Sequence, residues 1–142
     1  MSSAHPGGRV GSRQLDVLLR LAVAGALVGH GAYGAFISRP SWYGYFSLFG
    51  LSESVVESTG LLRTVGGAEI ALGIAALAFP VPALLMVLTG WKIFTELLRP
   101  IAGEPFWEFI ERSSNMVAPL VLLYVRGWPT SLSSWFGGKR RV

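Results

Sequence analysis

The segment Trp91–Arg112, WKIFTELLRPIAGEPFWEFIER, places a cluster of charges at the end of an apolar helix pattern. Residues 81–90, which precede it, contain no charged side chain. Lys92 and Glu96 are four residues apart, so an α-helix puts them on one face, one turn apart. Because the preceding run is apolar, we predict that Lys92 lies inside a membrane.

The composition of the whole chain indicates the same setting. Of its 142 residues, 51% are hydrophobic and only 14% are charged, which is typical of a small polytopic membrane protein with one domain. The absence of cysteine from the sequence excludes disulfides, thiolate metal sites and cysteine redox chemistry. The net charge is +4, but the basic residues are few and concentrated near the chain ends, so they indicate membrane orientation and no nucleic-acid partner.

Hydropathy and the spacing of glycine and proline predict an all-α fold, a polytopic membrane four-helix bundle with a short interfacial aromatic segment between its first two helices. The transmembrane domain is expected to cover residues 14–126, with helices at 14–37, 60–79, 81–98 and 105–125. Residues 1–13 are expected to form a flexible N-terminus, and residues 127–142 a flexible basic tail.

Small residues predict how the helices meet. Gly25 and Gly29 share one face of the first helix, and Gly67 begins a run of small residues at every fourth position of the second, as in closely packed membrane helices. Pro80 and Pro82 predict a short turn, and hence an antiparallel hairpin, between the second and third helices.

Prolines and aromatic residues define the remaining features. The third helix is expected to break at Pro100 and Gly103, and Pro119 is expected to kink the fourth. The connection 39–59 is rich in aromatic residues, which predicts a segment lying at the membrane interface.

Four spans put both termini on the same side of the membrane. The basic residues near that side are Arg9, Arg13, Arg126, Lys139, Arg140 and Arg141, whereas the opposite side has Glu53, Glu57, Glu104, Glu108 and Glu111. Since basic residues favour the cytoplasmic side, both termini are predicted to be cytoplasmic and the aromatic connections to face outward.

Residue counting predicts that the buried charges meet. At a rise of about 1.5 Å per residue, Glu69 and Lys92 reach a similar depth and are expected to form an ion pair. An unpaired charge at the bilayer centre costs at least about 2.5–3.5 kcal/mol on insertion scales, so the ionisable groups should converge. The expected result is a polar pocket that opens outward, lined by His30, Glu69, Lys92, Glu96 and Arg112, with Tyr33, Trp91 and Trp107 as walls.

The same residues also have structural interpretations. The pair of Glu69 with Lys92 either serves a ligand or a proton, or only fixes the register of two helices. His30 either serves the pocket or is a packing histidine that bonds to Glu96. An interfacial role at the outer membrane edge is expected for Arg63, Arg99, Glu108 and Glu111.

Several specific chemistries lack the residues that they need. A bis-histidine haem requires two intramembrane histidines, and only His30 qualifies. A metal site built from His30, Glu69 and Glu96 would lose its carboxylates to Lys92 and the arginines, so no metal is expected. The sequence shows no serine-protease-like triad, phosphate-binding loop or dinucleotide fingerprint, and no catalytic residue is assigned.

Three stretches give the chain a family resemblance: GHGAYGAF at the end of the first helix, GGAEIALGIAAL in the second, and the polar end of the third. On these, residues 14–126 resemble the DoxX-like family of four-helix bacterial membrane proteins. The resemblance implies a compact bundle in the bacterial cytoplasmic (inner) membrane and puts His30 and Glu69 at the family's histidine–glycine and glutamate positions. Some members are subunits of a thiosulfate:quinone oxidoreductase, and others are associated with redox and oxidative-stress complexes. The stretch 91–112 is more elaborate than the family pattern.

The leading functional hypothesis is a small integral-membrane subunit of a redox or respiratory assembly, such as an accessory subunit of a quinone-linked oxidoreductase. A histidine, acids and bases with aromatic walls suit hydrogen bonds to carbonyl oxygens and proton exchange, so the expected ligand is a quinone headgroup or a small anion. The expected partners are the lipid bilayer and either another membrane protein or further copies of this chain. The alternatives are a structural or accessory subunit that docks a larger partner complex, and a small oligomeric transporter.

Overall fold

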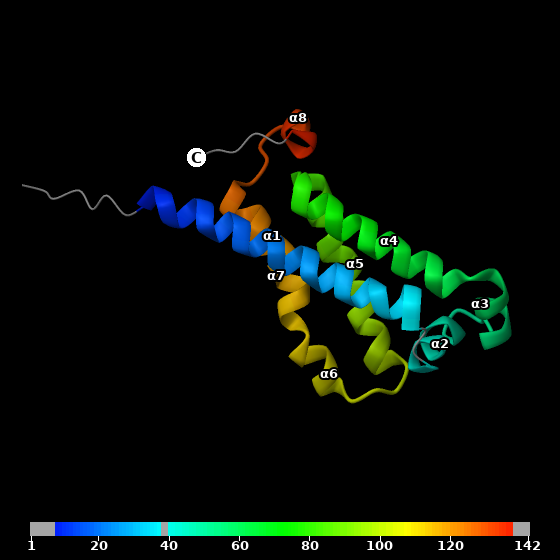
Figure 1. Cartoon of the computed structure of the whole chain (residues 1–142). Helices are drawn as coiled ribbons and strands as arrows, with labels where there is room; N and C mark the ends of the chain where they lie inside the picture. Colours follow the sequence, from blue (N-terminus) through cyan, green and yellow to red (C-terminus); the bar gives the residue numbers. More distant parts are fainter. Residues whose placement is uncertain (1–7, 38–39, 138–142) are drawn as a thin grey trace, which may run out of the picture.

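The computed structural model describes residues 8–37 and 40–137, and within these ranges the chain is helical and contains no strand. Its elements are α1 (Gly8–Ala32), the π-helical turn η1 (Tyr33–Ile37), α2 (Pro40–Ser47), α3 (Glu53–Thr59), α4 (Leu61–Ala78), α5 (Pro82–Ile101), α6 (Phe106–Glu111), α7 (Ser113–Arg126) and α8 (Leu132–Phe136). The predicted all-α fold class is confirmed (Figure 1).

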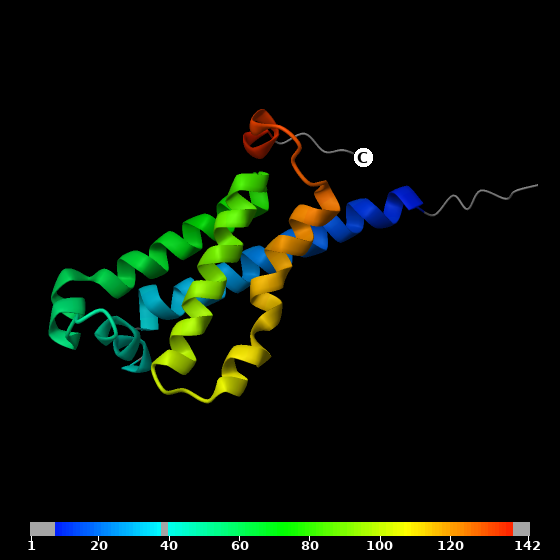
Figure 2. The same ribbon diagram turned by 180° about the vertical axis from the view of Figure 1, so that it is seen from behind.

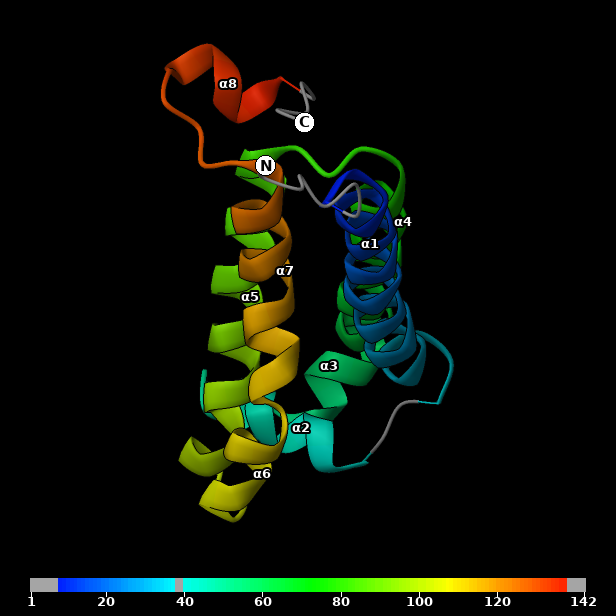
Figure 3. The same cartoon turned by 90° about the vertical axis from the view of Figure 1, so that its left-hand side faces the viewer.

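Four long helices form two pairs. Helix α1 packs along α4 and also contacts α7, while α5 packs along α7. Helices α4 and α5 run in opposite directions as predicted, but they diverge and touch only slightly (Figure 2). One end of the bundle is formed by α2, α3 and α6, and α8 lies at the other end (Figure 3).

Two helical stretches are long and apolar enough to cross a membrane, Arg13–Ile37 and Leu61–Ala78. Four spans were expected from the hydropathy of the sequence. Helix α5 has 20 residues but includes Lys92, Glu96 and Arg99, and α7 has only 14 residues. Length and composition therefore support two spans.

Two helices form inside segments that were predicted to be flexible. Helix α1 begins at Gly8, while residues 1–7 lie outside the described part of the chain. Helix α8 forms within the predicted tail because Ser131 and Ser134 make a capping box, in which each side-chain oxygen accepts a hydrogen bond from the backbone N–H of the other residue. Residues 138–142 also lie outside the described ranges.

The expected fourth helix is divided into α6 and α7. The division falls at Arg112, whose backbone angles are φ −91° and ψ 8°, and Pro119 lies inside α7 without ending it. Helix α5 continues through Pro100 to Ile101, and the chain turns at Gly103, where φ is +94°. The third helix therefore ends later than predicted, and the fourth begins with a separate short helix.

An apolar layer crosses the bundle between two polar layers. It consists of Val23 and Leu27 from α1, Ala76 from α4, Leu85 and Leu88 from α5, and Leu122 and Leu123 from α7. On the side of α8, Asp16 forms ion pairs of 2.8 Å with Arg20 and with Arg126, and Arg20 donates to the carbonyl of Leu77 at 3.3 Å. This first polar layer ties α1 to α4 and α7.

A close helix contact joins α1 to α4 at Gly31 and Gly66. A Cβ at Gly31 would lie 2.5 Å from the carbonyl oxygen of Gly66, closer than any side chain tolerates. By contrast, a Cβ at Gly25, Gly29 or Gly67 would have no neighbour within 4 Å among the described residues. The predicted contact face was therefore wrong, because small residues recur on more than one face of each helix and spacing alone does not select the face.

The two adjacent glycines of α4 provide a matched test of this contact. Gly66→Ala is expected to lower the free energy of unfolding by about 1–3 kcal/mol, because the new methyl group collides with the backbone of α1. Gly67→Ala is expected to be neutral or to stabilise by up to about 1 kcal/mol, since alanine has a higher helix propensity than glycine. Chemical denaturation of the purified variants measures both, and equal effects at the two positions would contradict the packing described.

Candidate functional site

The buried carboxylate of Glu69 joins three helices. Glu69 belongs to α4 and is 1% exposed. One of its oxygens lies 2.6 Å from Nδ1 of His30 on α1. The other accepts a hydrogen bond of 2.7 Å from the indole N–H of Trp91 on α5 and lies 3.9 Å from Nζ of Lys92. Glu69 lies close to Lys92, as predicted, and it also contacts His30 and Trp91.

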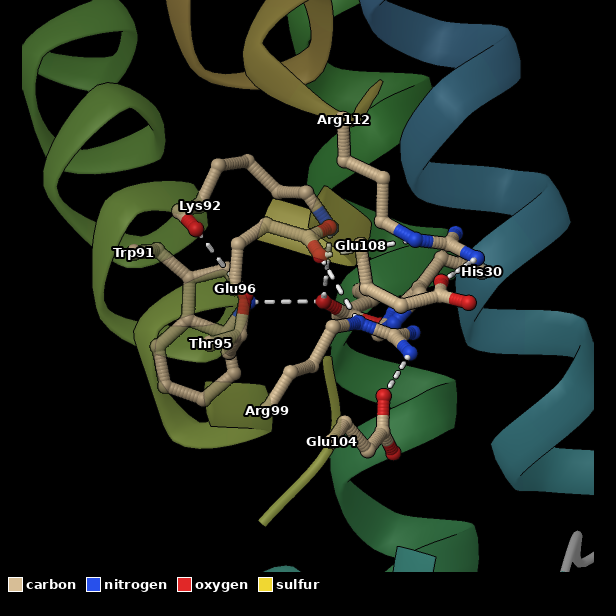
Figure 4. Close-up of polar contacts among 10 residues, drawn as sticks. His30, Trp91, Lys92, Thr95, Glu96, Arg99, Glu104, Glu108 and Arg112 are labelled. Carbon is tan, nitrogen blue, oxygen red and sulfur yellow. Dashed lines mark hydrogen bonds and ion pairs between the residues drawn. The ribbon is translucent and has the colours of Figure 1, made fainter. Parts of the chain in front are cut away.

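A second buried carboxylate, that of Glu96, lies close to three cationic side chains. Lys92 Nζ is 3.7 Å from Glu96 Oε1, while the Nε atoms of Arg99 and Arg112 lie 2.9 Å and 4.0 Å from Oε2 (Figure 4). Lys92, Glu96 and Arg99 meet because they are four and three residues apart on α5. Arg112 reaches Glu96 from the junction of α6 and α7.

Two more carboxylates complete the network at its exposed edge. Arg99 donates to Glu104 at 2.9 Å, and Arg112 donates to Glu108 at 3.4 Å. The network thus contains the four carboxylates of Glu69, Glu96, Glu104 and Glu108, the three cations Lys92, Arg99 and Arg112, and His30. Every carboxylate contacts at least one of these basic groups, which offsets the cost of removing the charges from water.

A cavity of about 260 Å³ lies where α4 and α5 diverge, beneath α2. Its polar or partly polar lining residues are His30, Tyr45, Glu69, Trp91, Thr95 and Arg99. Its apolar lining residues are Trp42, Phe46, Phe49, Leu51, Leu61, Leu62, Val65, Phe94 and Leu98. The site is therefore an apolar cavity with a few polar groups, which is typical of small-molecule sites.

Helix α2 closes one side of this cavity through two aromatic residues. The ring of Trp42 stacks on His30, with 4.5 Å between the ring centroids. The hydroxyl of Tyr45 donates to Glu104, and the guanidinium of Arg99 lies over the Tyr45 ring, 5.8 Å from its centroid. Burial, together with the hydrogen bond to Glu104, raises the pKa of Tyr45.

The predicted site residues separate into two groups. His30, Glu69, Lys92, Glu96 and Arg112 all belong to one network, as expected from their depths, but of these only His30 and Glu69 line the cavity. Of the three predicted walls, Trp91 lines it and Tyr33 and Trp107 do not. Trp107 belongs to α6 and is 75% exposed.

Two expectations about single side chains are changed by the structure. His30 bonds to Glu69, not to Glu96. Arg99 was assigned to the outer edge but is 8% exposed and belongs to the network. Its spacing of three residues from Glu96 was the available signal. Trp42, Tyr45 and Glu104 were missed, since nothing in an aromatic interfacial segment or a loop indicates which cavity it covers.

The site has no evident place for a metal ion. No three histidine, cysteine, aspartate or glutamate side chains within residues 8–37 and 40–137 lie close enough together to hold one.

Comparison of the chain with family models, with curated proteins and with solved structures found no match.

Glu96 and Glu108 provide a matched pair of charge-removing substitutions. Glu96→Gln is expected to lower the free energy of unfolding by about 3–5 kcal/mol, because it removes the buried carboxylate that Lys92, Arg99 and Arg112 share. Glu108→Gln is expected to cost less than about 1 kcal/mol, since that side chain is 38% exposed. Equilibrium denaturation compares the two, and a cost at Glu96 no larger than that at Glu108 would show that the network does not support the fold.

The raised pKa of Tyr45 predicts its behaviour in alkaline solution. An ordinary phenol ionises with a pKa of about 10, and Tyr45 in the folded protein is expected to keep its proton beyond that pH. The contribution of protonated Tyr45 to the free energy of unfolding is therefore complete below pH about 10. It declines above that pH, where Tyr45 loses its proton in the unfolded chain but keeps it in the folded protein.

Tyrosinate absorbance measures this directly. The folded parent and the folded Tyr45→Phe variant are expected to absorb equally up to pH about 11, and to differ by one tyrosine in denaturant. A difference between the folded proteins near pH about 10 would contradict the assignment.

Proposed function

We propose that the chain is an integral-membrane four-helix bundle formed by α1, α4, α5 and α7. The distribution of polarity supports this. The buried polar or charged side chains are Asp16, Glu69, Thr89, Lys92, Glu96 and Arg99, whereas large apolar side chains such as Leu18, Phe36, Ile74 and Val87 are exposed. Exposed apolar surface of this extent is typical of a surface that contacts lipid.

Helix α5 is proposed as a span although it contains three charges. Lys92, Glu96 and Arg99 are all buried inside the bundle, and the outer face presents Val87, Ile93, Leu97 and Ile101. Its 20 residues correspond to about 30 Å of helix, the thickness of a bilayer core. Helix α7 would cross the membrane, and α6 would lie in the interface.

The orientation and compartment follow as parts of the same proposal. The excess of basic residues near the termini would place both termini in the cytoplasm, with α2, α3 and α6 on the outer side. The resemblance to the DoxX-like family supports the bacterial cytoplasmic membrane and a role in a redox or respiratory assembly.

Within such an assembly, we propose that the cavity binds a quinone headgroup. The observation that supports this best is the apolar cavity with His30 and Arg99 at its polar side. Since Nδ1 of His30 faces Glu69, Nε2 is left for a ligand. When the imidazole carries both protons, Nε2–H can donate to a carbonyl oxygen, as the guanidinium of Arg99 can. The gap between α4 and α5 would admit such a ligand from the lipid phase.

A quinone fits this site better than a small anion does. Each cation of the network already contacts a carboxylate: Lys92 contacts Glu69 and Glu96, Arg99 contacts Glu96, and Arg112 contacts Glu108. An added anion would therefore face existing negative charges. The apolar walls also favour a neutral aromatic ring.

The accessory-subunit alternative also has a specific observation in its favour. Helix α6 exposes Phe106, Trp107 and Ile110 at 57%, 75% and 45%, and these side chains would suit contact with a partner subunit. Purification from membranes separates the two functions, because bound quinone absorbance supports the first, and a stoichiometric larger subunit without quinone supports the second. Flux through proteoliposomes would instead indicate transport.

Binding of a benzoquinone with a decyl chain tests the quinone proposal. We expect His30→Ala and Glu69→Gln each to raise the Kd at least about tenfold, which is the loss of about 1.4 kcal/mol, because the first removes a ligand contact and the second removes the charge that orients His30. Glu57→Gln, an exposed carboxylate on α3 outside the cavity, is the control and should bind like the parent. Unchanged binding by both cavity variants would refute the assignment.

A further inference from the structure

Three buried polar atoms of the network make no hydrogen bond within the described part of the chain: Lys92 Nζ, Glu96 Oε1 and Arg112 Nε. The side chains of Lys92 and Glu96 are 2% and 1% exposed. A buried donor or acceptor without a partner costs about 1–3 kcal/mol, and proteins commonly satisfy such atoms with internal water. Three such atoms in one cluster point to bound water.

The separations between these groups suit bridging water. Lys92 Nζ is 3.9 Å from Glu69 Oε1 and 3.7 Å from Glu96 Oε1, and Arg112 Nε is 4.0 Å from Glu96 Oε2. Each distance exceeds a direct N–H···O hydrogen bond of about 2.7–3.2 Å. A single water molecule can hydrogen-bond to both atoms across such a gap.

We propose that Lys92, Glu96 and Arg112 hold a short file of water molecules that connects Glu69, at the cavity, with the exposed edge at Glu108. Protons pass along this file between the cavity and the solution. The inference rests on the proposed function only for the identity of the ligand that exchanges the proton, because the path is a property of the network itself.

The proton movement balances without electron transfer. A proton enters from solution beside Glu108, which is 38% exposed, and water passes it to the carboxylate of Glu96. A second water, held by Lys92, passes it to Glu69, which exchanges it for a proton of His30 Nδ1 or of the ligand. Lys92 and Arg112 keep their own protons throughout, since they act by donating hydrogen bonds that hold the water. The exchanged proton leaves along the same file, so one proton leaves for each that enters.

The surroundings give this path one open end. Toward α8, the network meets the fully buried side chains of Leu85, Leu88 and Leu122. The cavity itself has mostly apolar walls. The branch through Arg99 leads to Glu104 and Tyr45, which lie at the same end of the bundle as Glu108. Water is therefore expected to reach Glu69 from the α6 end.

The indole N–H of Trp91 reports on this path because it donates directly to Glu69. The full-length purified protein, labelled with ¹⁵N-tryptophan, is transferred into D₂O, and NMR follows the loss of each indole signal. Trp91→Phe assigns the signal among the five tryptophans. We expect exchange of Trp91 to slow at least about tenfold in Lys92→Met and in Arg112→Met, since an apolar side chain then replaces a group that holds the water.

The direction of the change separates this effect from general loosening. A destabilised protein opens more often and exchanges faster, so slower exchange identifies a blocked path. Arg20→Gln, which removes an ion pair in the opposite polar layer, is the control and should leave the Trp91 rate unchanged or faster.

Unchanged or faster exchange of Trp91 in the folded variants would overturn the proposal. If Lys92→Met does not fold, the exchange rate in Arg112→Met decides. Slowed exchange in a protein that binds no quinone would keep the water path and reject only the proposed ligand.

Discussion

The carboxylate of Glu69 is the group on which the arrangement of helices depends. It contacts His30 on α1 and Trp91 and Lys92 on α5, so one buried charge links α1, α4 and α5. The close contact of Gly31 with Gly66 makes this geometry available, since it brings α1 against α4 beside His30. The charge and the glycine contact therefore support each other.

The same interaction explains why a cavity exists. Trp91 and Lys92 stand between the backbones of α4 and α5 at the level of Glu69, and the two helices touch only slightly. The space beside them is closed by α2 through the stacking of Trp42 on His30. The cavity and the ion network are thus two consequences of one arrangement, and removing a charge should affect both stability and ligand binding.

Depth within the bundle was predictable from sequence, but rotation about the helix axes was not. Counting residues from the prolines along the apolar runs was enough to predict that Glu69 and Lys92 lie close together. It did not select Gly31 and Gly66 as the contact face, nor exclude Trp107 from the cavity wall, because these depend on which way each helix faces its neighbour. The division at Arg112 was missed because no glycine or proline marks it, and the position of α2 depends on a tertiary contact that its aromatic composition does not specify.

An experimental structure of the protein in lipid nanodiscs, with a decyl-benzoquinone present, tests where the ligand binds. We expect the quinone ring in the cavity between α2, α4 and α5, with a carbonyl oxygen within hydrogen-bond distance of His30 or Arg99, and with the bonds of Glu69 to His30 and Trp91 intact. A ring bound elsewhere, or a cavity closed by direct packing of α4 on α5 with the Glu69 contacts broken, would contradict it.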